Sequence, residues 1–248
     1  MKNTLGVVIV DGVGFRNFIL SNFLNECLDI FDQIIIFSGL PASAYISLKN
    51  PNIRIVELPV FRETGKTWFW RKMKEVAHMQ KYKDDFAGID YNLQNNYPAK
   101  RSKRAFITKM IFRITSKFHS EKWINRFYSR QVHSFKNNEV TKLYIEILKG
   151  EKPDLLFFTH QRPPYLAPLD YAAKKLGVNS CSFIFSWDNL PSKGRMAAPF
   201  ESFLVWSDLM KEELHYFYPA TQNIKVEVVG TPQFEPYVLD RYKSSKEN

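Results

Sequence analysis

Short runs of branched apolar residues, separated by segments with helical spacing, are the feature that most constrains the fold. Such runs cover residues 4–10, 33–39 and 53–60, and each is continuous, as in a strand that is buried on both faces. After the first run, apolar side chains recur at helical spacing from Phe15 onward, and a short helix is expected from Pro41. This order predicts parallel strands with right-handed crossovers, and therefore an α/β fold with a doubly wound, mostly parallel, Rossmann-like sheet.

The same alternation returns in the second half of the chain. Four further strands are expected, within residues 155–159, 180–189, 200–208 and 224–234. The helices between them carry stop signals, which are Gly150, Gly177 and Pro219 in chain order. Residues 1–237 are therefore predicted to form one domain, and residues 238–248 are interpreted as a tail or as the start of a linker.

Residues 61–138 contain no run that fits a buried strand. Residues 68–86 and 104–135 have helical composition, whereas residues 88–100, with Pro98 and several asparagines, are predicted to form a loop. The whole segment is therefore interpreted as a helical insertion between the third and fourth strands.

The positive charge of the chain is concentrated in that insertion. The net charge is +10, and residues 100–136 hold eleven lysines and arginines against one acid, Glu121. The basic isoelectric point therefore describes a local patch rather than a basic protein. Nucleic acid is not favoured as a partner, because no recognition module accompanies the patch.

A basic amphipathic helix is predicted within this patch, and it has the composition of a helix lying on an anionic membrane. Its apolar stripe consists of Phe106, Ile107, Met110, Ile111, Ile114 and Phe118. The residues expected to meet the membrane are Lys103, Arg104, Phe106, Lys109, Met110, Arg113, Lys117 and Trp123. The other interpretation is an ordinary surface helix whose stripe packs on the core.

Two cysteines and the lack of a long apolar run bear on the compartment. Cys27 and Cys181 both lie in apolar segments and are interpreted as free thiols in a reducing compartment. No run of about 18 apolar residues occurs, so no membrane-spanning helix is expected. The first residues are interpreted as a strand rather than a signal peptide, because Asp11 interrupts the apolar run. We therefore expect a cytoplasmic protein, peripheral on the inner face of the plasma membrane.

The glycine turn after the first strand does not match a dinucleotide-binding fingerprint. Asn17 occupies the place of the third glycine, and the second strand ends without the acid that would bind a ribose hydroxyl. The lysine pattern of a P-loop is missing too, and no His, Cys and Asp cluster has the spacing of a metal site. No cofactor or metal is therefore expected in this domain, and a nucleotide-dependent oxidoreductase is the least favoured function.

Polar side chains follow several of the predicted strands. Because ligands of open α/β sheets bind beyond the carboxyl ends of the strands, these residues predict a cleft for a polar ligand. Besides Asp11 and His160, the residues expected to line it are Gly12, Gly14, Arg16, Asn17, Gln161, Arg162, Trp187, Asp188 and Asn189. Simpler structural roles are the alternatives: His160 as a hydrogen-bonding group, and the last two residues as a cap for the segment that follows.

Three segments of the second half resemble a known family. They are FTHQRPPYLAPLDYAAKKLGV, the SWDN loop with the FLVWSD strand that follows it, and VVGTPQF. They are similar to the amino-terminal domain of GT-B fold glycosyltransferases, especially the bacterial enzymes of capsule and surface-polysaccharide biosynthesis. The resemblance covers residues 153–237, whereas residues 1–60 fit only at the level of the fold and residues 61–138 do not fit.

The resemblance implies the acceptor-binding half of an enzyme that transfers a sugar from a nucleotide sugar to a lipid-linked or polysaccharide acceptor. The nucleotide sugar would be a co-substrate bound by a second domain. No donor-site pattern follows Tyr237, so this domain is expected on a separate polypeptide or on the other part of a divided enzyme. The alternative function is not enzymatic: the chain would be a non-catalytic membrane-docking subunit that recruits a donor-domain protein.

The resemblance also implies roles for individual residues. Asp11 matches the position of a catalytic base after the first strand, where the helix that follows would keep it ionised. His160 is the alternative base, with Asp188 as the group that would orient it. Arg16 and Arg162 would pair with an anionic acceptor such as a phospholipid-linked sugar.

Overall fold

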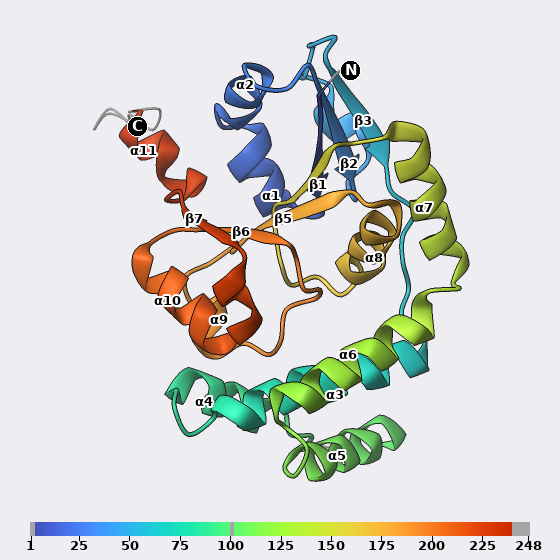
Figure 1. The fold of residues 1–248 in the computed structure, drawn as a ribbon, viewed down its shortest axis with the longest axis vertical. Coiled ribbons are helices and arrows are strands. Elements are labelled where there is room, and N and C mark those ends of the chain that lie inside the picture. Colours follow the sequence, from blue (N-terminus) through green and yellow to red (C-terminus); the bar gives the residue numbers. More distant parts are fainter. Residues whose placement is uncertain (1–2, 100–101, 240–248) are drawn as a thin grey trace, which may run out of the picture.

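Seven parallel strands form one sheet in a computed structural model that describes residues 3–99 and 102–239. Their order is β3-β2-β1-β4-β5-β6-β7 (Figure 1). The strands are β1 (Thr4–Ile9), β2 (Gln33–Ser38), β3 (Ile53–Glu57), β4 (Leu155–Phe158), β5 (Asn179–Phe183), β6 (Ser202–Val205) and β7 (Lys225–Val228). The predicted α/β class is confirmed, because every expected strand is present and the order is that of a Rossmann-like, doubly wound sheet.

Alternate side chains of the strands face two separate apolar cores. In β1, Leu5, Val7 and Ile9 belong to one core and Val8 belongs to the other. The first core is covered by a π-helical turn (Phe15–Ile19), α2 (Phe23–Leu28) and the 3₁₀ turn η2 (Ala42–Tyr45). The second core is covered by α7 (Glu139–Glu151), α8 (Leu166–Leu176) and α10 (Asp208–Phe217). Helices on both faces explain why the strands are continuously apolar.

The helix expected after β1 is broken into pieces. A single turn, α1 (Gly12–Gly14), leads into the π-helical turn, and α2 starts only at Phe23. The backbone N–H of Phe23 donates to Oγ of Ser21 at 3.2 Å, so a side chain competes with the helical hydrogen bonds at the break.

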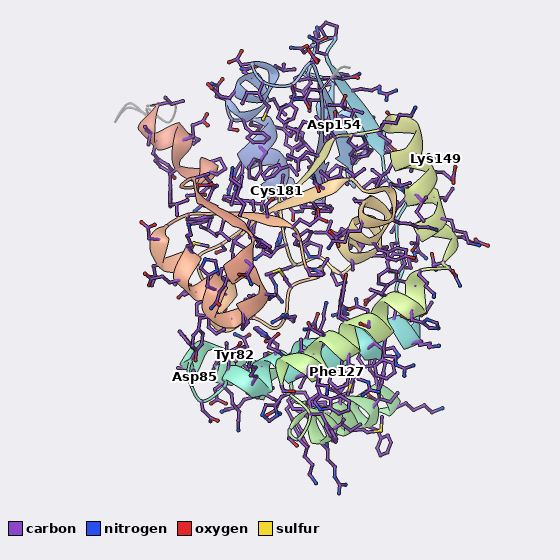
Figure 2. The ribbon with its side chains drawn as sticks, viewed as in Figure 1. Tyr82, Asp85, Phe127, Lys149, Asp154 and Cys181 are labelled. Carbon is purple, nitrogen blue, oxygen red and sulfur yellow. The ribbon has the colours of Figure 1, made fainter. Side chains whose placement is uncertain are left out.

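The predicted insertion between β3 and β4 is wholly helical. It consists of α3 (Gly65–Tyr82), α4 (Ala87–Asn96), α5 (Lys103–Thr115) and α6 (Glu121–Phe135). The long helix α3 packs along α6 and contacts α4 and α5. Figure 1 shows these helices beyond one end of the sheet, and Figure 2 labels Phe127, a buried side chain of α6.

One part of the insertion differs from the sequence prediction. Most of residues 88–100 belongs to helix α4 and not to a loop. Ile89 and Leu93, one helical turn apart, are both buried, at 0% and 6% exposure. Their packing outweighs the low helix propensity of the glycine and asparagines around them.

Two of the three predicted helix ends are confirmed. Gly177 follows α8 in the left-handed conformation, with φ of 72°, and α10 ends just before Pro219, which opens the 3₁₀ turn η3 (Pro219–Asn223). Gly150 does not end α7, because the helix continues to Glu151 and Lys152 takes the left-handed cap, with φ of 50°. Pro153 follows directly and prevents further helix.

The remaining segments lie near the carboxyl ends of β5 and β7. They are α9 (Asn189–Ser192), the 3₁₀ turn η4 (Pro232–Phe234) and α11 (Glu235–Val238). Most of the predicted tail, residues 240–248, lies outside the described residues. No helix of the described part combines the length and apolar character needed to cross a bilayer.

Both cysteines are free thiols, as predicted. Cys181 lies within β5 (Figure 2). Burial raises the pKa of Cys27 to about 11 and also raises the pKa of Cys181. Raised pKa values keep both thiols protonated and therefore poorly reactive.

Candidate functional site

The carboxyl ends of β1 and β4 lie next to each other, at the point where the strand order of the sheet reverses. Open α/β sheets bind their ligands at such a point. Asp11 follows β1 and His160 follows β4, so the fold brings these two predicted residues to the same edge. They are close enough that the charge of Asp11 acts on the pKa of the His160 ring.

Asp11 caps the turn after β1. Its Oδ1 accepts hydrogen bonds from the backbone N–H groups of Val13, at 3.1 Å, and Gly14, at 2.7 Å. Gly14 lets this turn approach β4, because a Cβ atom there would lie 2.8 Å from Oγ1 of Thr159. Within the described residues Oδ2 of Asp11 makes no hydrogen bond, so this carboxylate oxygen remains for a ligand.

His160 is held as a neutral ring. Its Nδ1 accepts a hydrogen bond from the backbone N–H of Arg162 at 3.1 Å, and the ring stacks on Phe185 with a centroid distance of 4.3 Å. Burial lowers the pKa of His160 to about 4, although the charge of Asp11 opposes this shift. Because Nδ1 accepts, the neutral ring carries its proton on Nε2. Near neutral pH His160 is therefore a hydrogen-bond donor at Nε2 and a weak base.

A cavity of about 580 Å³ opens beside His160, between the loops that follow β4 and β5 and helix α3. From these loops, the predicted residues that line it are His160, Arg162, Asp188 and Asn189. The sequence did not indicate the other polar lining residues, which are Arg71, Lys72 and Glu75 of α3, Ser186 and Lys193. Four cationic side chains against two carboxylates make this cavity favourable for an anionic ligand.

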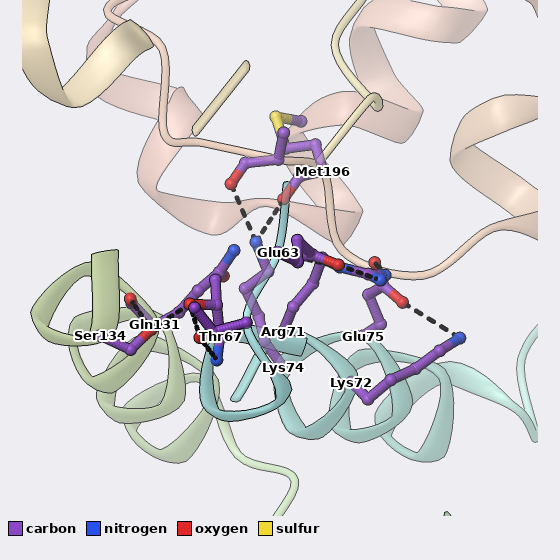
Figure 3. A network of polar contacts seen from close by, with 11 residues as sticks. Glu63, Thr67, Arg71, Lys72, Lys74, Glu75, Gln131, Ser134 and Met196 are labelled. Atoms are coloured by element: carbon purple, nitrogen blue, oxygen red, sulfur yellow. Dashed lines mark hydrogen bonds and ion pairs between the residues drawn. The ribbon is translucent and has the colours of Figure 1, made fainter. Parts of the chain in front are cut away.

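The part of the cavity wall that α3 supplies is a fixed ion-pair network (Figure 3). Arg71 binds both oxygens of Glu63 at 2.7 Å and donates to Glu75 at 2.8 Å. Burial disfavours the charge of Arg71, but the two carboxylates outweigh burial and raise its pKa. Burial likewise disfavours the charge of Glu75, and Arg71 and Lys72 reverse this effect and lower its pKa. The network therefore stays ionised and rigid, with little charge left for a ligand.

Arg162 differs from Arg71 because no carboxylate of the described residues lies within ion-pair distance of it. Its Nη1 donates to the carbonyl oxygen of Gly194 at 2.8 Å, which fixes the guanidinium at the cavity wall. Lys193 directly precedes Gly194, and its Nζ lies 3.9 Å from Oδ2 of Asp188, which is a loose contact. Arg162 and Lys193 are thus the cations best placed to pair with an anion.

Asp188 does not orient His160, contrary to the sequence-based hypothesis. Its Oδ1 accepts a hydrogen bond from Oγ of Ser186 at 2.6 Å, and its Oδ2 faces Lys193. The Nδ1 atom of His160 is already occupied by the backbone of Arg162. Asp188 also precedes α9, so it shapes the loop while its side chain lines the cavity.

Three other predicted residues have different surroundings. Gln161 is buried, and its Oε1 accepts from the backbone N–H of Phe185 at 3.1 Å, so it ties the loops after β4 and β5 together. Asn189 is also buried, and its Nδ2 donates to the carbonyl oxygen of Ser186 at 3.4 Å. Trp187 is 66% exposed and does not line this cavity.

Arg16 and Asn17 line a second cavity of about 290 Å³, between the π-helical turn and residues 232–237. The Nε of Arg16 donates to Oδ1 of Asn17 at 3.1 Å. Asn17 is buried, and its Nδ2 has no hydrogen-bond partner among the described residues. The single predicted cleft is therefore two cavities, both near the carboxyl ends of the strands.

The predicted membrane stripe of α5 is divided between two directions. Ile111 is buried, as are Ala105 and Phe112, whereas Phe106 is 73% and Met110 39% exposed. The cations Lys103, Arg104, Lys109, Arg113 and Lys117 are exposed as well. Trp123 instead packs against Phe118 and Phe127 at ring distances of 4.7 and 5.9 Å. The helix thus packs on its neighbours and still presents a basic and apolar outer face, from which long side chains extend in Figure 2.

No known protein family matches this sequence, and no curated protein matches it either. Within residues 3–99 and 102–239, no group of three or more His, Cys, Asp or Glu side chains is arranged to hold a metal ion.

Proposed function

We propose that this chain is the acceptor-binding half of a glycosyltransferase, and that the cavity beside His160 binds a saccharide acceptor carrying a phosphate. The sugar would come from a nucleotide sugar bound by a second domain. The observation that carries this proposal is a positively charged cavity beyond the carboxyl ends of β4 and β5, which His160 lines, with Asp11 at the adjacent switch point near enough for its charge to act on His160. A lipid-linked sugar phosphate combines the required anion and hydroxyl groups.

The roles of the residues follow from their protonation. Transfer requires that the acceptor hydroxyl loses its proton as its oxygen attacks the sugar. Oδ2 of Asp11 is the group to take that proton, because it has no hydrogen-bond partner among the described residues, whereas Nδ1 of His160 is occupied by the backbone of Arg162 and its Nε2 already carries a proton. His160 would donate from Nε2 to an oxygen of the acceptor, and Arg162 would pair with its phosphate.

Binding of a sugar 1-phosphate tests the proposed anion site. Isothermal titration with N-acetylglucosamine 1-phosphate should show binding that Arg162→Met weakens by about tenfold or more, because the partner of a charged hydrogen bond is lost. The matched control is Arg130→Met, which removes an exposed arginine of α6 outside the cavity. Equal affinity in both variants would remove Arg162 from the site.

Transfer activity, measured with the donor domain reconstituted, tests the catalytic roles. Asp11→Asn keeps an acceptor for the cap of α1 and should still lose most activity, because an amide takes no proton. His160→Ala should also lose most activity, whereas His160→Gln, which retains an N–H donor near Nε2, should keep more. Full activity in both Asp11→Asn and His160→Ala would contradict the assignment.

We infer membrane docking as a second function, since the outer face of α5 combines exposed Phe106 and Met110 with the exposed cations Lys103, Lys109 and Arg113, and exposed Lys117 follows the helix. Such a face binds anionic lipid by burying apolar side chains and by charge, at about 1 kcal/mol for each basic residue near the surface. This function serves either a transferase with a lipid-linked acceptor or a non-catalytic subunit that recruits a donor-domain protein.

Co-sedimentation with vesicles tests this surface. The protein should bind phosphatidylserine-containing vesicles but not neutral ones, and binding should weaken as salt rises. The double variant Phe106→Ser with Met110→Ser should bind less, while Leu209→Ser, which changes an exposed leucine of α10, should bind as the unmodified protein does. Binding that is indifferent to lipid charge or to the α5 variant would exclude this surface.

A further inference from the structure

A third cavity, of about 230 Å³, lies between the insertion and the loops that precede β6 and β7. It is separate from the cavity beside His160, because the two share no lining residue. Its wall is mostly apolar and includes Ile124, Met196, Ala198, Phe200, Phe203 and Ile224. Asn125, Pro199 and Ala220 line it as well and are exposed, so the cavity opens to solvent on their side.

Lys74 of α3 lines this apolar cavity although its side chain is only 1% exposed. Its Nζ donates to the carbonyl oxygens of Met196 and Ala197, both at 2.9 Å, and Figure 3 shows it reaching across to this loop. An ammonium group has three N–H donors, so one is left over. Among the described residues no carboxylate lies within ion-pair distance of Lys74, and buried lysines ordinarily have one.

The cavity lining contains a second cation and no carboxylate. That cation, Arg195, forms an ion pair with Glu121 at 3.0 Å, a carboxylate that it shares with Lys81, and stacks over the ring of Tyr218 at 4.4 Å. Lys74 faces the ring of Tyr128 with a centroid distance of 5.1 Å. The cavity therefore combines an apolar wall with one buried positive group that lacks a counter-ion.

We propose that this cavity binds a small monocarboxylate with an apolar body, whose carboxylate accepts the free N–H of Lys74 and whose body packs on Phe200 and Phe203. A carboxylate would supply the missing counter-ion, and the apolar wall would exclude strongly hydrated anions such as phosphate. This inference is independent of the proposed transferase function, because it uses a different cavity.

Proton linkage gives the proposal a second signature. The charged and titratable groups around Lys74 are Arg71, Glu75 and His78 on α3, Tyr128 on α6, and Arg162, Arg195 and Tyr218 on the facing loops. Burial lowers the pKa of Lys74 to about 7, which Glu75 opposes and the three arginines reinforce. A carboxylate pairs with the protonated amine, so its affinity should fall by about tenfold per pH unit above that pKa.

Isothermal titration with benzoate and hexanoate, against benzamide and hexanamide as neutral isosteres, tests the proposal. Both carboxylates should bind, and the amides should bind at least about tenfold more weakly, because only the carboxylates form the charged hydrogen bond. Lys74→Met should abolish this preference. Lys66→Met, which removes an exposed lysine of the same helix, should leave it unchanged.

A second variant keeps the test independent of any folding defect in Lys74→Met. Ala220→Phe narrows the exposed side of the cavity without touching Lys74 and should also reduce benzoate affinity by about tenfold or more. The proposal is overturned if neither carboxylate binds to the unmodified protein at millimolar concentration. It is overturned as well if the amides bind equally, or if both Lys74→Met and Ala220→Phe retain the affinity of the unmodified protein.

Discussion

Two glycines of the turn after β1 are under different constraints. Gly14 has a helical φ of −57°, which any residue adopts, so only the close approach to Oγ1 of Thr159, at 2.8 Å from an added Cβ, requires glycine there. Gly14→Ala should lower the free energy of unfolding by about 1–3 kcal/mol, because an extra methyl must push this side chain aside. Gly12→Ala, with nothing within 4 Å of its Cβ, should change it by less than about 1 kcal/mol. Urea unfolding of both variants checks this, and equal midpoints would contradict it.

The sequence predicted where some site residues lie in the fold, but it did not predict their hydrogen-bond partners. Asp11 and His160 were expected at one edge because parallel strands end on the same side of a sheet. The partner of the His160 ring was not predictable, because it depends on the path of a short loop that places the N–H of Arg162 within 3.1 Å of Nδ1. Arg16 and Asn17 line a different cavity from His160 because residues 232–237, which are far away in the sequence, form its other wall.

The end of α7 offers a test at the scale of an element. Lys152 adopts the left-handed conformation that favours glycine, and Gly150 lies inside the helix with nothing within 4 Å of its Cβ. Lys152→Gly should therefore stabilise the protein by about 1 kcal/mol. Gly150→Ala should also stabilise it by about 0.5–1 kcal/mol, because alanine is the better helix former. Thermal unfolding checks both, and destabilisation by Gly150→Ala would mean that Gly150 is the cap after all.

Strands were easier to predict than helices in this chain. The central strands β1, β2 and β4 are buried on both faces, so their sequences are continuous apolar runs bounded by turn residues. Helix α4 was missed because its two buried side chains, Ile89 and Leu93, are embedded in asparagine and glycine, which favour loops. The break between the π-helical turn and α2 was missed because apolar residues at helical spacing continue across it, although the backbone N–H of Phe23 donates to Oγ of Ser21 there.

At the scale of the whole molecule, His78 makes stability depend on pH. It is 0% exposed, neither ring nitrogen has a hydrogen-bond partner among the described residues, and rings of Tyr82 and Tyr218 lie 5.0 and 5.2 Å away. Burial holds the pKa of His78 well below its ordinary value of 6.5, and the charges of Arg195 and Lys81 act in the same direction. The unfolded chain therefore takes up the proton first as pH falls. The contribution of neutral His78 to the free energy of unfolding is therefore complete above about pH 6.5 and decreases as the pH falls below this value.

His78→Phe should remove this loss. Between pH 6.5 and pH 5 its unfolding free energy should fall less steeply than that of the unmodified protein. The two slopes should differ by up to about 1.4 kcal/mol per pH unit. At pH 7 the variant should be more stable by about 1–3 kcal/mol, because two unpartnered polar atoms are replaced. His133→Phe, at an exposed histidine, is the control and should keep the pH dependence. Denaturant unfolding at several pH values measures both, and parallel curves for all three proteins would contradict this prediction.

The helical insertion supplies one wall of the cavity beside His160, through Arg71, Lys72 and Glu75 of α3. The sequence shows Arg71 and Glu75 four residues apart, which indicates a charged side of a helix. It does not show that this side faces the loops after β4 and β5, because that contact is set by how α3 packs along α6 and how α6 packs on α8. Long-range placement of this kind is not encoded in any local pattern.

The cavity beside His160 therefore has two walls of separate origin. The strands supply His160 and Arg162, while a segment joined to the sheet at two points supplies Arg71 and Glu75. A variant that kept the strands but carried another segment in this place would retain His160 and Arg162 and change the rest of the cavity wall, and with it the ligand that fits. Replacing this segment is accordingly the direct way to change which ligand the cavity binds.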